Sequence, residues 1–254
     1  MQNPVPILDA HTHVHTLPGH EWDSPPERIV GLMDAAGIAR SVIMPYSEIR
    51  PEDPSLIDEM AEAAERFPGR LLPFARMHPS GGEAGVALFE SAVRERGHRG
   101  LKFHPVGSMV HPADPGHVAF TRKAAELGVP VLFHCGDEEY TLPWQIARLL
   151  EAVPEATIIL GHMGGYSHVP DAIEVAERYP NAILETSACP HPGLIREAIA
   201  RVGPDRVVFG SDGPGCLPAL EVKKIRDLGL PEAVERKVLH DTMARLLGLE
   251  EGAT

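Results

Sequence analysis

The chain has few positive charges and no long run of apolar residues. Its 23 Lys and Arg residues stand against 36 Asp and Glu residues, so the formal net charge is −13. This charge argues against nucleic acid and anionic membranes as partners, because both attract basic surfaces. No segment approaches the roughly 18 apolar residues of a membrane-spanning helix, and the first residues lack the basic segment of a secretion signal. We therefore expect a cytoplasmic protein.

Cysteine is also scarce. Cys135, Cys189 and Cys216 are far apart in the sequence, and none belongs to a CxxC pair. An odd number of widely spaced cysteines does not predict a disulfide framework and is typical of a reducing compartment. Cys135 directly follows a histidine to which we assign a function below, so we expect its side chain to be a buried thiol and not a nucleophile.

The sequence does contain one alternation that runs from end to end. Short apolar runs predict eight strands, at residues 5–10, 41–45, 71–76, 100–104, 129–134, 157–161, 182–185 and 207–210. Segments with helical periodicity lie between them, at residues 25–36, 54–67, 83–96, 115–127, 142–153, 169–179, 192–202 and 217–228, with a last helix at 231–247. Most of these helices end at Gly or Pro, which are common stop signals.

This alternation predicts the fold class. Strands that alternate strictly with helices favour a parallel α/β sheet. Eight repeats in about 250 residues favour a closed (β/α)₈ (TIM) barrel over an open sheet. We expect the last helix to cap the barrel, and we expect one domain over residues 1–254, since no linker or shift in composition divides the chain.

Residues that bind metals stand where several predicted strands end. They are His11 and His13 at the end of the first strand, His104 at the end of the fourth, His134 of the fifth, His162 of the sixth and Asp212 of the eighth. Residues two apart on a strand point to the same side, so His11 and His13 can reach one ion. In a barrel all these strand ends share the face that carries the active site. Histidines and a carboxylate that converge there are typical of a divalent metal site.

On these motifs the chain resembles the amidohydrolase superfamily, and within it the amidohydrolase-2 branch of short, metal-dependent barrels. The matching segments are LDAHTH, GLKFHP, LFH, LGHMGG, FGSDGP and the closing VLHDTMARLLGL, which together span about residues 7–249. The closing segment departs from the branch in having Thr242-Met243 where Asn-Ala is usual. We expect that departure to affect packing more than chemistry.

The resemblance implies a ligand set and two catalytic residues. His11, His13, His134 and Asp212 would hold one divalent ion; zinc is our first expectation, with manganese, iron and cobalt as alternatives because histidine-rich sites bind all of them. His162 would polarise the substrate or direct the attacking water, and Asp212 would accept a proton from that water. His15 could compete as a ligand, but we favour a place in the pocket wall or in solvent.

Four further residues are predicted to contact the substrate or to support the ligands: Arg76, His78, Lys102 and His104. Arg76 could bind a substrate carboxylate in a bidentate fork or form a structural ion pair at the barrel rim. In binuclear members of the superfamily a carboxylated lysine on the fourth strand bridges two metals. We favour one metal, with Lys102 lying deeper in the barrel than His104.

Two activities are consistent with the resemblance. Our first prediction is hydrolysis of an amide, lactone or ester-like bond in a small molecule, since a divalent ion lowers the pKa of bound water to about 7. The alternative is nonoxidative decarboxylation of a small carboxylic acid, which cations at the mouth such as Arg76 and Arg50 would favour. A barrel that only binds ligands is a third reading, disfavoured because every motif position carries a competent residue. We expect a homodimer as the default assembly.

Overall fold

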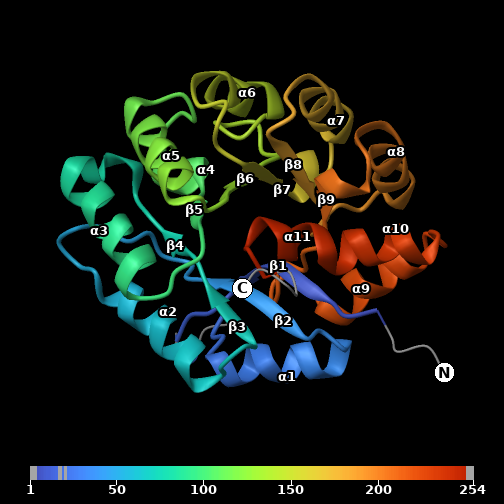
Figure 1. Ribbon diagram of the computed structural model, residues 1–254, viewed down its shortest axis with the longest axis horizontal. Coiled ribbons are helices and arrows are strands. Elements are labelled where there is room, and N and C mark those ends of the chain that lie inside the picture. The colour runs from blue at the N-terminus through green and yellow to red at the C-terminus, as the bar shows by residue number, and fades with distance from the viewer. Residues whose placement is uncertain (1–4, 17–18, 20–21, 250–254) are drawn as a thin grey trace.

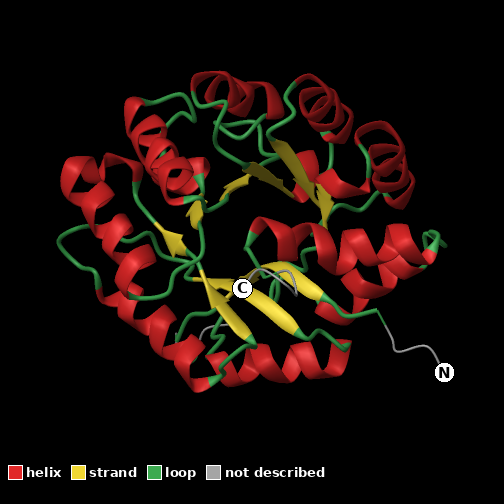
Figure 2. Cartoon of the chain, in the orientation of Figure 1, coloured by secondary structure: helices red, strands yellow, loops and turns green. Residues whose placement is uncertain are grey.

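The computed structural model describes residues 5–16, 19 and 22–249, and it shows parallel strands surrounded by a ring of helices (Figure 1, Figure 2). The strands are β1 (Leu8–His13), β2 (Arg40–Met44), β3 (Leu71–Pro73), β4 (Ala75–Arg76), β5 (Leu101–Phe103), β6 (Val131–His134), β7 (Ile158–Gly161), β8 (Ala182–Glu185) and β9 (Val207–Val208). The strands pair in sequence order within two sheets, β1 to β3 and β4 to β9. The predicted α/β barrel is therefore confirmed.

Hydrogen bonds join the two sheets into one ring. Between β3 and β4, the backbone nitrogen of Phe74 donates to Ile43 O at 2.9 Å, and that of Ala75 donates to Gly100 O at 3.0 Å. The third predicted strand is thus one extended segment that changes its partner at Phe74. The backbone nitrogen of Ala10 donates to Phe209 O at 3.0 Å, which links β1 to the end of β9. These bonds close the barrel.

The helices follow the predicted order. They are α1 (Pro26–Ala36), α2 (Ser55–Arg66), α3 (Gly82–Glu95), α4 (Pro105–Ser108), α5 (Pro115–Leu127), α6 (Pro143–Ala152), α7 (Val169–Arg178), α8 (Pro192–Val202), α9 (Pro218–Arg226), α10 (Glu232–Arg236) and α11 (Thr242–Leu246), with short turns η1 (Pro79–Gly81), η2 (His162–Gly164), η3 (Pro204–Arg206) and η4 (Lys237–Asp241). The last predicted helix is three segments, because η4 is a π-helical turn between α10 and α11.

Several strand boundaries differ from the prediction, and those of β1 and β9 have clear physical reasons. β1 begins and ends three residues later than expected, which places His11 and His13 inside the strand. Pro6 has no N–H to donate to a ladder, so the pairing starts beyond it. β9 stops at Val208 because the backbone nitrogen of Phe209 donates to Val238 O of η4, at 2.9 Å, and not to a neighbouring strand.

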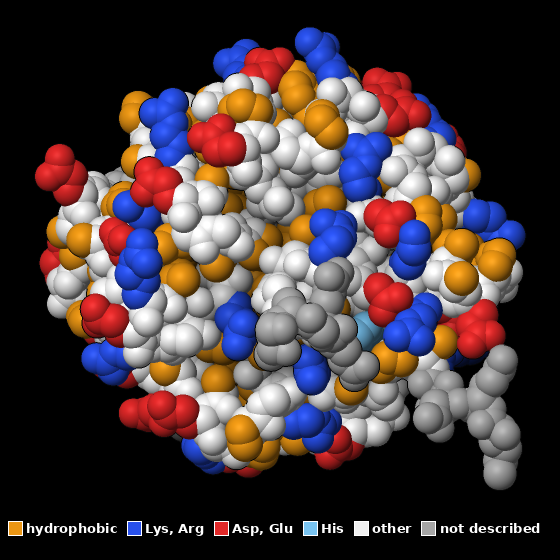
Figure 3. Space-filling view, viewed as in Figure 1, with side chains coloured by type: hydrophobic (Ala, Val, Ile, Leu, Met, Phe, Trp, Pro, Cys, Tyr) orange, Lys and Arg blue, Asp and Glu red, His pale blue; other side chains and the backbone are white. Residues whose placement is uncertain are grey.

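The closing helix α11 plugs one end of the barrel (Figure 1). Met243, Ala244 and Leu247 pack with an inner cluster formed by Leu8, Ala10, Val42, Met44, Leu72, Phe74, Leu132, Ile159, Ile183 and Val208. The predicted cap is confirmed, and the unusual Met243 is buried within it. The face seen in Figure 3 carries Lys and Arg side chains interspersed with Asp and Glu side chains. Among the described residues no helix is long and apolar enough to cross a membrane.

Candidate metal centre

Three side chains meet at the barrel end opposite α11. His11 in β1, His162 directly after β7 and Asp212 after β9 each place a potential ligand atom within 4.8 Å of the other two. Asp212 Oδ1 lies 3.5 Å from His11 Nε2 and 3.2 Å from His13 Nε2. Ligands at about 2.1 Å from one tetrahedral ion lie roughly 3.4 Å apart. The spacing of these donors is therefore that of a candidate site for a divalent metal.

The protonation states of this group also suit a metal. Burial holds the pKa of His11 well below its ordinary value and lowers that of His13 to about 4. Burial alone would raise the pKa of Asp212, but the neighbouring imidazoles, His11 first among them, hold it well below its ordinary value. Neutral imidazoles and an ionised carboxylate are the forms that coordinate cations. In addition, Nδ1 of His13 is buried without a hydrogen-bond partner among the described residues.

Backbone geometry at the centre is unusual. His162 has a φ of 62° and Asp212 has a φ of 56°. Both values lie in the left-handed region, which residues other than glycine rarely adopt. Such conformations cost roughly 1–3 kcal/mol each and concentrate at functional sites. Both residues belong to the group of close potential ligand atoms, which fits such a site.

Glu185, at the end of β8, orients two of the imidazoles. Its Oε2 lies 3.1 Å from His11 Nδ1 and accepts from the backbone nitrogen of His162 at 3.1 Å and from Ser187 Oγ at 2.8 Å. Ser187 Oγ also lies 2.9 Å from His162 Nδ1. Both imidazoles are therefore held through Nδ1, which leaves Nε2 directed at the centre, as carboxylate–histidine pairs do in metal sites. A Cβ at Gly210 would overlap the Glu185 carboxylate, so glycine is needed there.

Asp9 links β1 to the segment that follows β9. Its carboxylate accepts from the backbone nitrogen of His11 at 3.0 Å, from that of Ser211 at 2.8 Å and from Ser211 Oγ at 2.5 Å. Burial raises the pKa of Asp9 to about 7 despite these bonds. The aspartate of the segment LDAHTH therefore has a structural role: Asp9 fixes β1 against the loop that carries Asp212.

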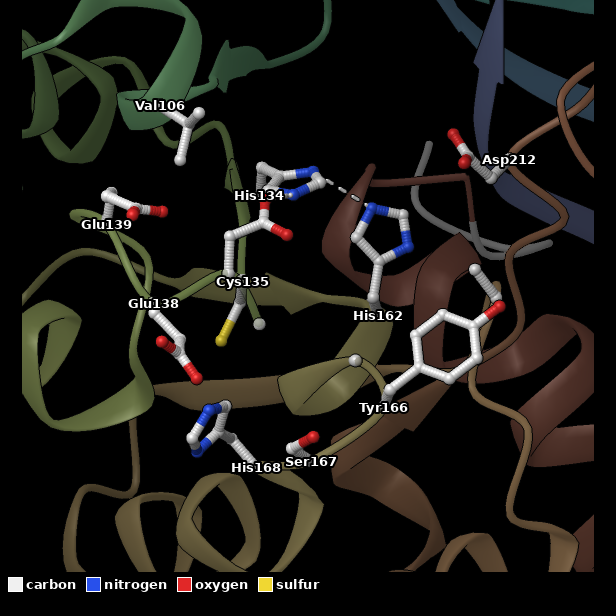
Figure 4. A pocket seen from close by; sticks show the side chains of 14 residues that line it. Val106, His134, Cys135, Glu138, Glu139, His162, Tyr166, Ser167, His168 and Asp212 are labelled. Carbon is white, nitrogen blue, oxygen red and sulfur yellow. Dashed lines mark hydrogen bonds and ion pairs between the residues drawn. The ribbon is translucent and has the colours of Figure 1, made fainter.

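His134, predicted as a ligand, lies next to His162. Its Nδ1 is 3.1 Å from His162 Nε2, while its Nε2 is 2.6 Å from Asp137 Oδ2 (Figure 4). Asp137 thus holds one ring nitrogen and leaves the other facing the centre. His162 stands between His134 and His11, with its ring centroid 4.7 Å from the first and 5.0 Å from the second. The predicted ligands and His162 form one contiguous group, and the ligand set itself stays a prediction.

Lys102 and His104 project from the end of β5. Lys102 is buried and its Nζ lies 2.8 Å from His11 Nε2, so it reaches the centre directly. Burial, helped by the charge of Arg76, lowers the pKa of Lys102 to about 7. His104 is less buried; its Nδ1 accepts from the backbone nitrogen of Gly107 at 2.8 Å, and its ring centroid lies 4.2 Å from that of His134. Lys102 is the deeper of the two, as predicted.

Arg76 and His78 occupy the end of β4 and the turn after it. The predicted alternative for Arg76, a structural ion pair, is not found among the described residues: its guanidinium has no ion pair or hydrogen bond with any of them, although the side chain is only 6% exposed. Burial lowers the pKa of Arg76, whereas the charge of Glu48 opposes that shift. His78 Nδ1 accepts from the backbone nitrogen of Ser80 at 3.1 Å and so caps η1. Its predicted contact with substrate stays a prediction.

A cavity of about 650 Å³ opens beside the centre. His134, His162 and Asp212 form one side of it, and its other described lining residues are Val106, Cys135, Gly136, Asp137, Glu138, Glu139, Gly165, Tyr166, Ser167, His168 and Ala188 (Figure 4). This volume suits a small molecule. The Cys135 thiol is buried and burial raises its pKa, which agrees with the predicted unreactive thiol.

The sequence did not single out Tyr46 or Asp137. Tyr46 lies just beyond β2 and stacks on His13, with ring centroids 4.3 Å apart and planes 13° apart. Asp137 is three residues after His134, in the loop that follows β6. A position shortly after a strand end was the available signal for both residues. His15 pairs through its backbone with Ser24 and lies outside the group of three close ligand atoms.

Comparison with known proteins places this arrangement in context. The family model described as amidohydrolase matches residues 8–249. The structure is similar to 2,6-dihydroxybenzoate decarboxylase from Rhizobium, with a TM-score of 0.79, 19% identity and coverage of 96% of this chain and 99% of that one. It is also similar to dihydroxybenzoic acid decarboxylase from Polaromonas sp. JS666, solved with bound manganese and 2-nitroresorcinol (TM-score 0.77, 19% identity, 96% and 97% coverage).

A TIM-barrel protein from Bordetella bronchiseptica is similar to the same degree, with a TM-score of 0.79, 20% identity and coverage of 96% of this chain and 98% of that one. At such identities the likeness establishes the barrel fold. No curated protein matches the chain.

Proposed function

The chain belongs to the amidohydrolase family, and from that premise we propose that it is a metal-dependent lyase that decarboxylates a small carboxylic acid without an oxidant. This proposal reverses the order of the two activities expected from the sequence, where hydrolysis came first. Several of the similar solved structures are described as decarboxylases, which supports the reversal.

The observation that carries the proposal is the unpaired guanidinium of Arg76. Removing a charged group from water costs several kcal/mol, roughly, unless a counter-charge compensates it. Arg76 is buried, its Nε has no hydrogen-bond acceptor, and its guanidinium forms no ion pair with any described residue, although the charge of Glu48 acts on it. A substrate carboxylate would supply that counter-charge, with the bidentate geometry that guanidinium prefers. A neutral lactone or amide would not. Arg50, the other candidate cation, is exposed.

The residues of the centre have separable roles in this reaction. We assign His11, His13, His134 and Asp212 as ligands of one divalent ion, which when bound would supply positive charge beside the substrate oxygens as negative charge develops. Zinc was the first expectation; three of the similar solved structures hold manganese, so both metals belong in the test.

The carboxyl carbon leaves as CO₂, and the remaining carbon takes up one proton. His162 presents Nε2 to the same space, because Ser187 holds its Nδ1, and so is placed to deliver that proton. Glu185 and Asp137 keep the imidazoles in position. The atoms balance as one carboxylic acid giving CO₂ and one C–H bond.

The test is product analysis with protein loaded with Zn²⁺ or Mn²⁺. Small aromatic and aliphatic carboxylic acids are offered in D₂O, beside a matched set of lactones and amides. We expect CO₂ release, one deuterium in the product and no uptake of O₂. Turnover of a lactone or amide without CO₂ release would replace the proposal with hydrolysis.

A further inference from the structure

Two buried hydrogen-bond donors without partners lie on the His13 side of the centre. One is the Arg76 guanidinium, whose Nε is fully buried without an acceptor. The other is Tyr46, whose hydroxyl is also buried without a partner among the described residues. Buried polar groups are nearly always hydrogen-bonded, and each exception calls for an explanation. Two such donors in one place indicate a ligand that accepts from both.

The two groups act on each other and on the centre. Burial raises the pKa of the Tyr46 hydroxyl, the charge of Asp212 raises it further, and the charge of Arg76 opposes both. Tyr46 is held by its stacking on His13 and by an edge contact with Trp22, with ring centroids 5.2 Å apart in the second case. The hydroxyl is therefore fixed beside a predicted ligand.

The wall near Arg76 is shaped by Gly107. A Cβ at Gly107 would lie 3.3 Å from Arg76 Nη2 and 2.9 Å from His104 Nδ1, so a larger residue would press on both side chains. The guanidinium thus lies between the α4 turn and the centre.

Glu48 is the carboxylate with the strongest electrostatic effect on Arg76, yet the two groups do not form an ion pair. Glu48 Oε1 is itself buried without a partner, and its Oε2 lies 3.7 Å from His78 Nε2. Because Arg76 forms no ion pair with Glu48 or any other described residue, its guanidinium can still pair with an external anion.

The open cavity beside the centre is lined by acidic side chains. Asp137, Glu138 and Glu139 line it, and none of its described lining residues is Lys or Arg. Figure 4 shows Glu138 and Glu139 on the side of the cavity away from Asp212. Like charges brought together in a pocket disfavour binding, which is a means of selecting against a competing ligand.

We propose that Arg76 and Tyr46 form the subsite for a single substrate carboxylate, and that the acidic wall of the cavity excludes a second one. The substrate class is then monocarboxylic acids whose remaining part is uncharged. This inference rests on the proposed function in that the substrate is an acid, but it concerns binding and can be tested without turnover.

The test measures binding by calorimetry to the metal-loaded protein, with benzoate and acetate as monocarboxylate probes and phthalate and succinate as their dicarboxylate counterparts. We expect Arg76→Gln to weaken benzoate binding by at least about tenfold and Tyr46→Phe by about threefold, at unchanged metal content. Unchanged benzoate affinity in Arg76→Gln would overturn the subsite. Arg76→Lys keeps the charge without the fork and should bind with intermediate affinity.

Thermal unfolding separates this role from a structural one. Because Arg76 is buried without a partner, we expect Arg76→Met to keep or raise the melting temperature; a clear decrease would indicate a structural cation and contradict the subsite. The acidic wall is tested by the Glu138→Gln, Glu139→Gln double variant, in which phthalate binding should increase severalfold relative to benzoate. Equal binding of phthalate and benzoate by the native protein would overturn the exclusion. Absence of CO₂ release with intact benzoate binding would reject the proposed reaction and leave the subsite standing.

Discussion

The two ends of this barrel bury side chains of opposite kinds. At the end closed by α11, side chains such as Met243 and Phe74 are apolar and fully packed. At the other end, His13, Tyr46 and Arg76 carry buried polar atoms that have no partner in the described part of the chain. Since unsatisfied polar groups destabilise a fold, the packed end must offset what the polar end costs. This contrast indicates that function is found at the end where buried polar groups have no hydrogen-bond partner among the described residues.

The largest effect is expected from a substitution at the polar end of the barrel. His134→Ala should abolish turnover and lower the metal content, because a predicted ligand is lost while the barrel end at α11 is untouched. Metal per chain, measured by elemental analysis, and circular dichroism together check this. Full metal occupancy in the variant would remove His134 from the ligand set.

The matched experiment truncates a side chain at the packed end of the barrel. Met243→Ala should destabilise the protein by about 2–5 kcal/mol, the usual range for truncating a buried methionine. Met243 is 1% exposed and lies in the inner cluster with α11. Denaturant unfolding gives the change, and kcat per folded molecule should equal that of the native protein. A fall in kcat without a loss of stability would mean that the two ends are coupled.

The sequence predicted the barrel and its order of elements because hydrophobic periodicity and the Gly and Pro residues that end helices are local signals. It also placed His11, His13, His134, His162 and Asp212 together, since in a parallel barrel all strand ends meet on one face. It could not predict that Arg76 lacks an ion pair. That depends on how far Glu48 stands from the guanidinium, and a loop sets that distance.

Some predicted strand boundaries were wrong because they also depend on pairing between segments. β1 was placed three residues early because apolar residues before Pro6 read as strand, whereas the ladder needs donors that proline lacks. The division at Phe74 arises because one segment serves two neighbours. Tyr46 was missed because its role comes from stacking on His13 across two strands, which leaves no spacing pattern in the sequence.

A smaller effect is expected from a substitution that separates proton donation from metal binding at the polar end. His162→Ala should keep the metal and slow turnover by about 100-fold, as expected when a proton donor is removed. Glu185 still holds His11 in this variant, so ligand geometry is retained. Pre-steady-state product formation and metal analysis test it. Loss of metal would instead make His162 a ligand, consistent with its closeness to His11 and Asp212.

The smallest effect concerns stability against acid, away from the centre. His98 is 2% exposed and its Nε2 lies 3.1 Å from the backbone oxygen of Ile57. Burial lowers its pKa from 6.5 to about 4. Between these values the unfolded chain binds the proton and the folded chain does not, so stability is lost as pH falls from 6.5 towards 4. For this one group the loss between pH 7 and pH 5 is about 2 kcal/mol.

His98→Gln removes that titration, so the dependence of unfolding free energy on pH should become shallower by about this amount. Urea unfolding at pH 7 and pH 5, with His240→Gln as a less buried control, measures it. An unchanged slope would show that His98 titrates normally in the folded protein. A shallower slope with unchanged activity at pH 7 would show that a buried histidine outside the metal centre acts on stability alone, in contrast to the imidazoles at the polar end.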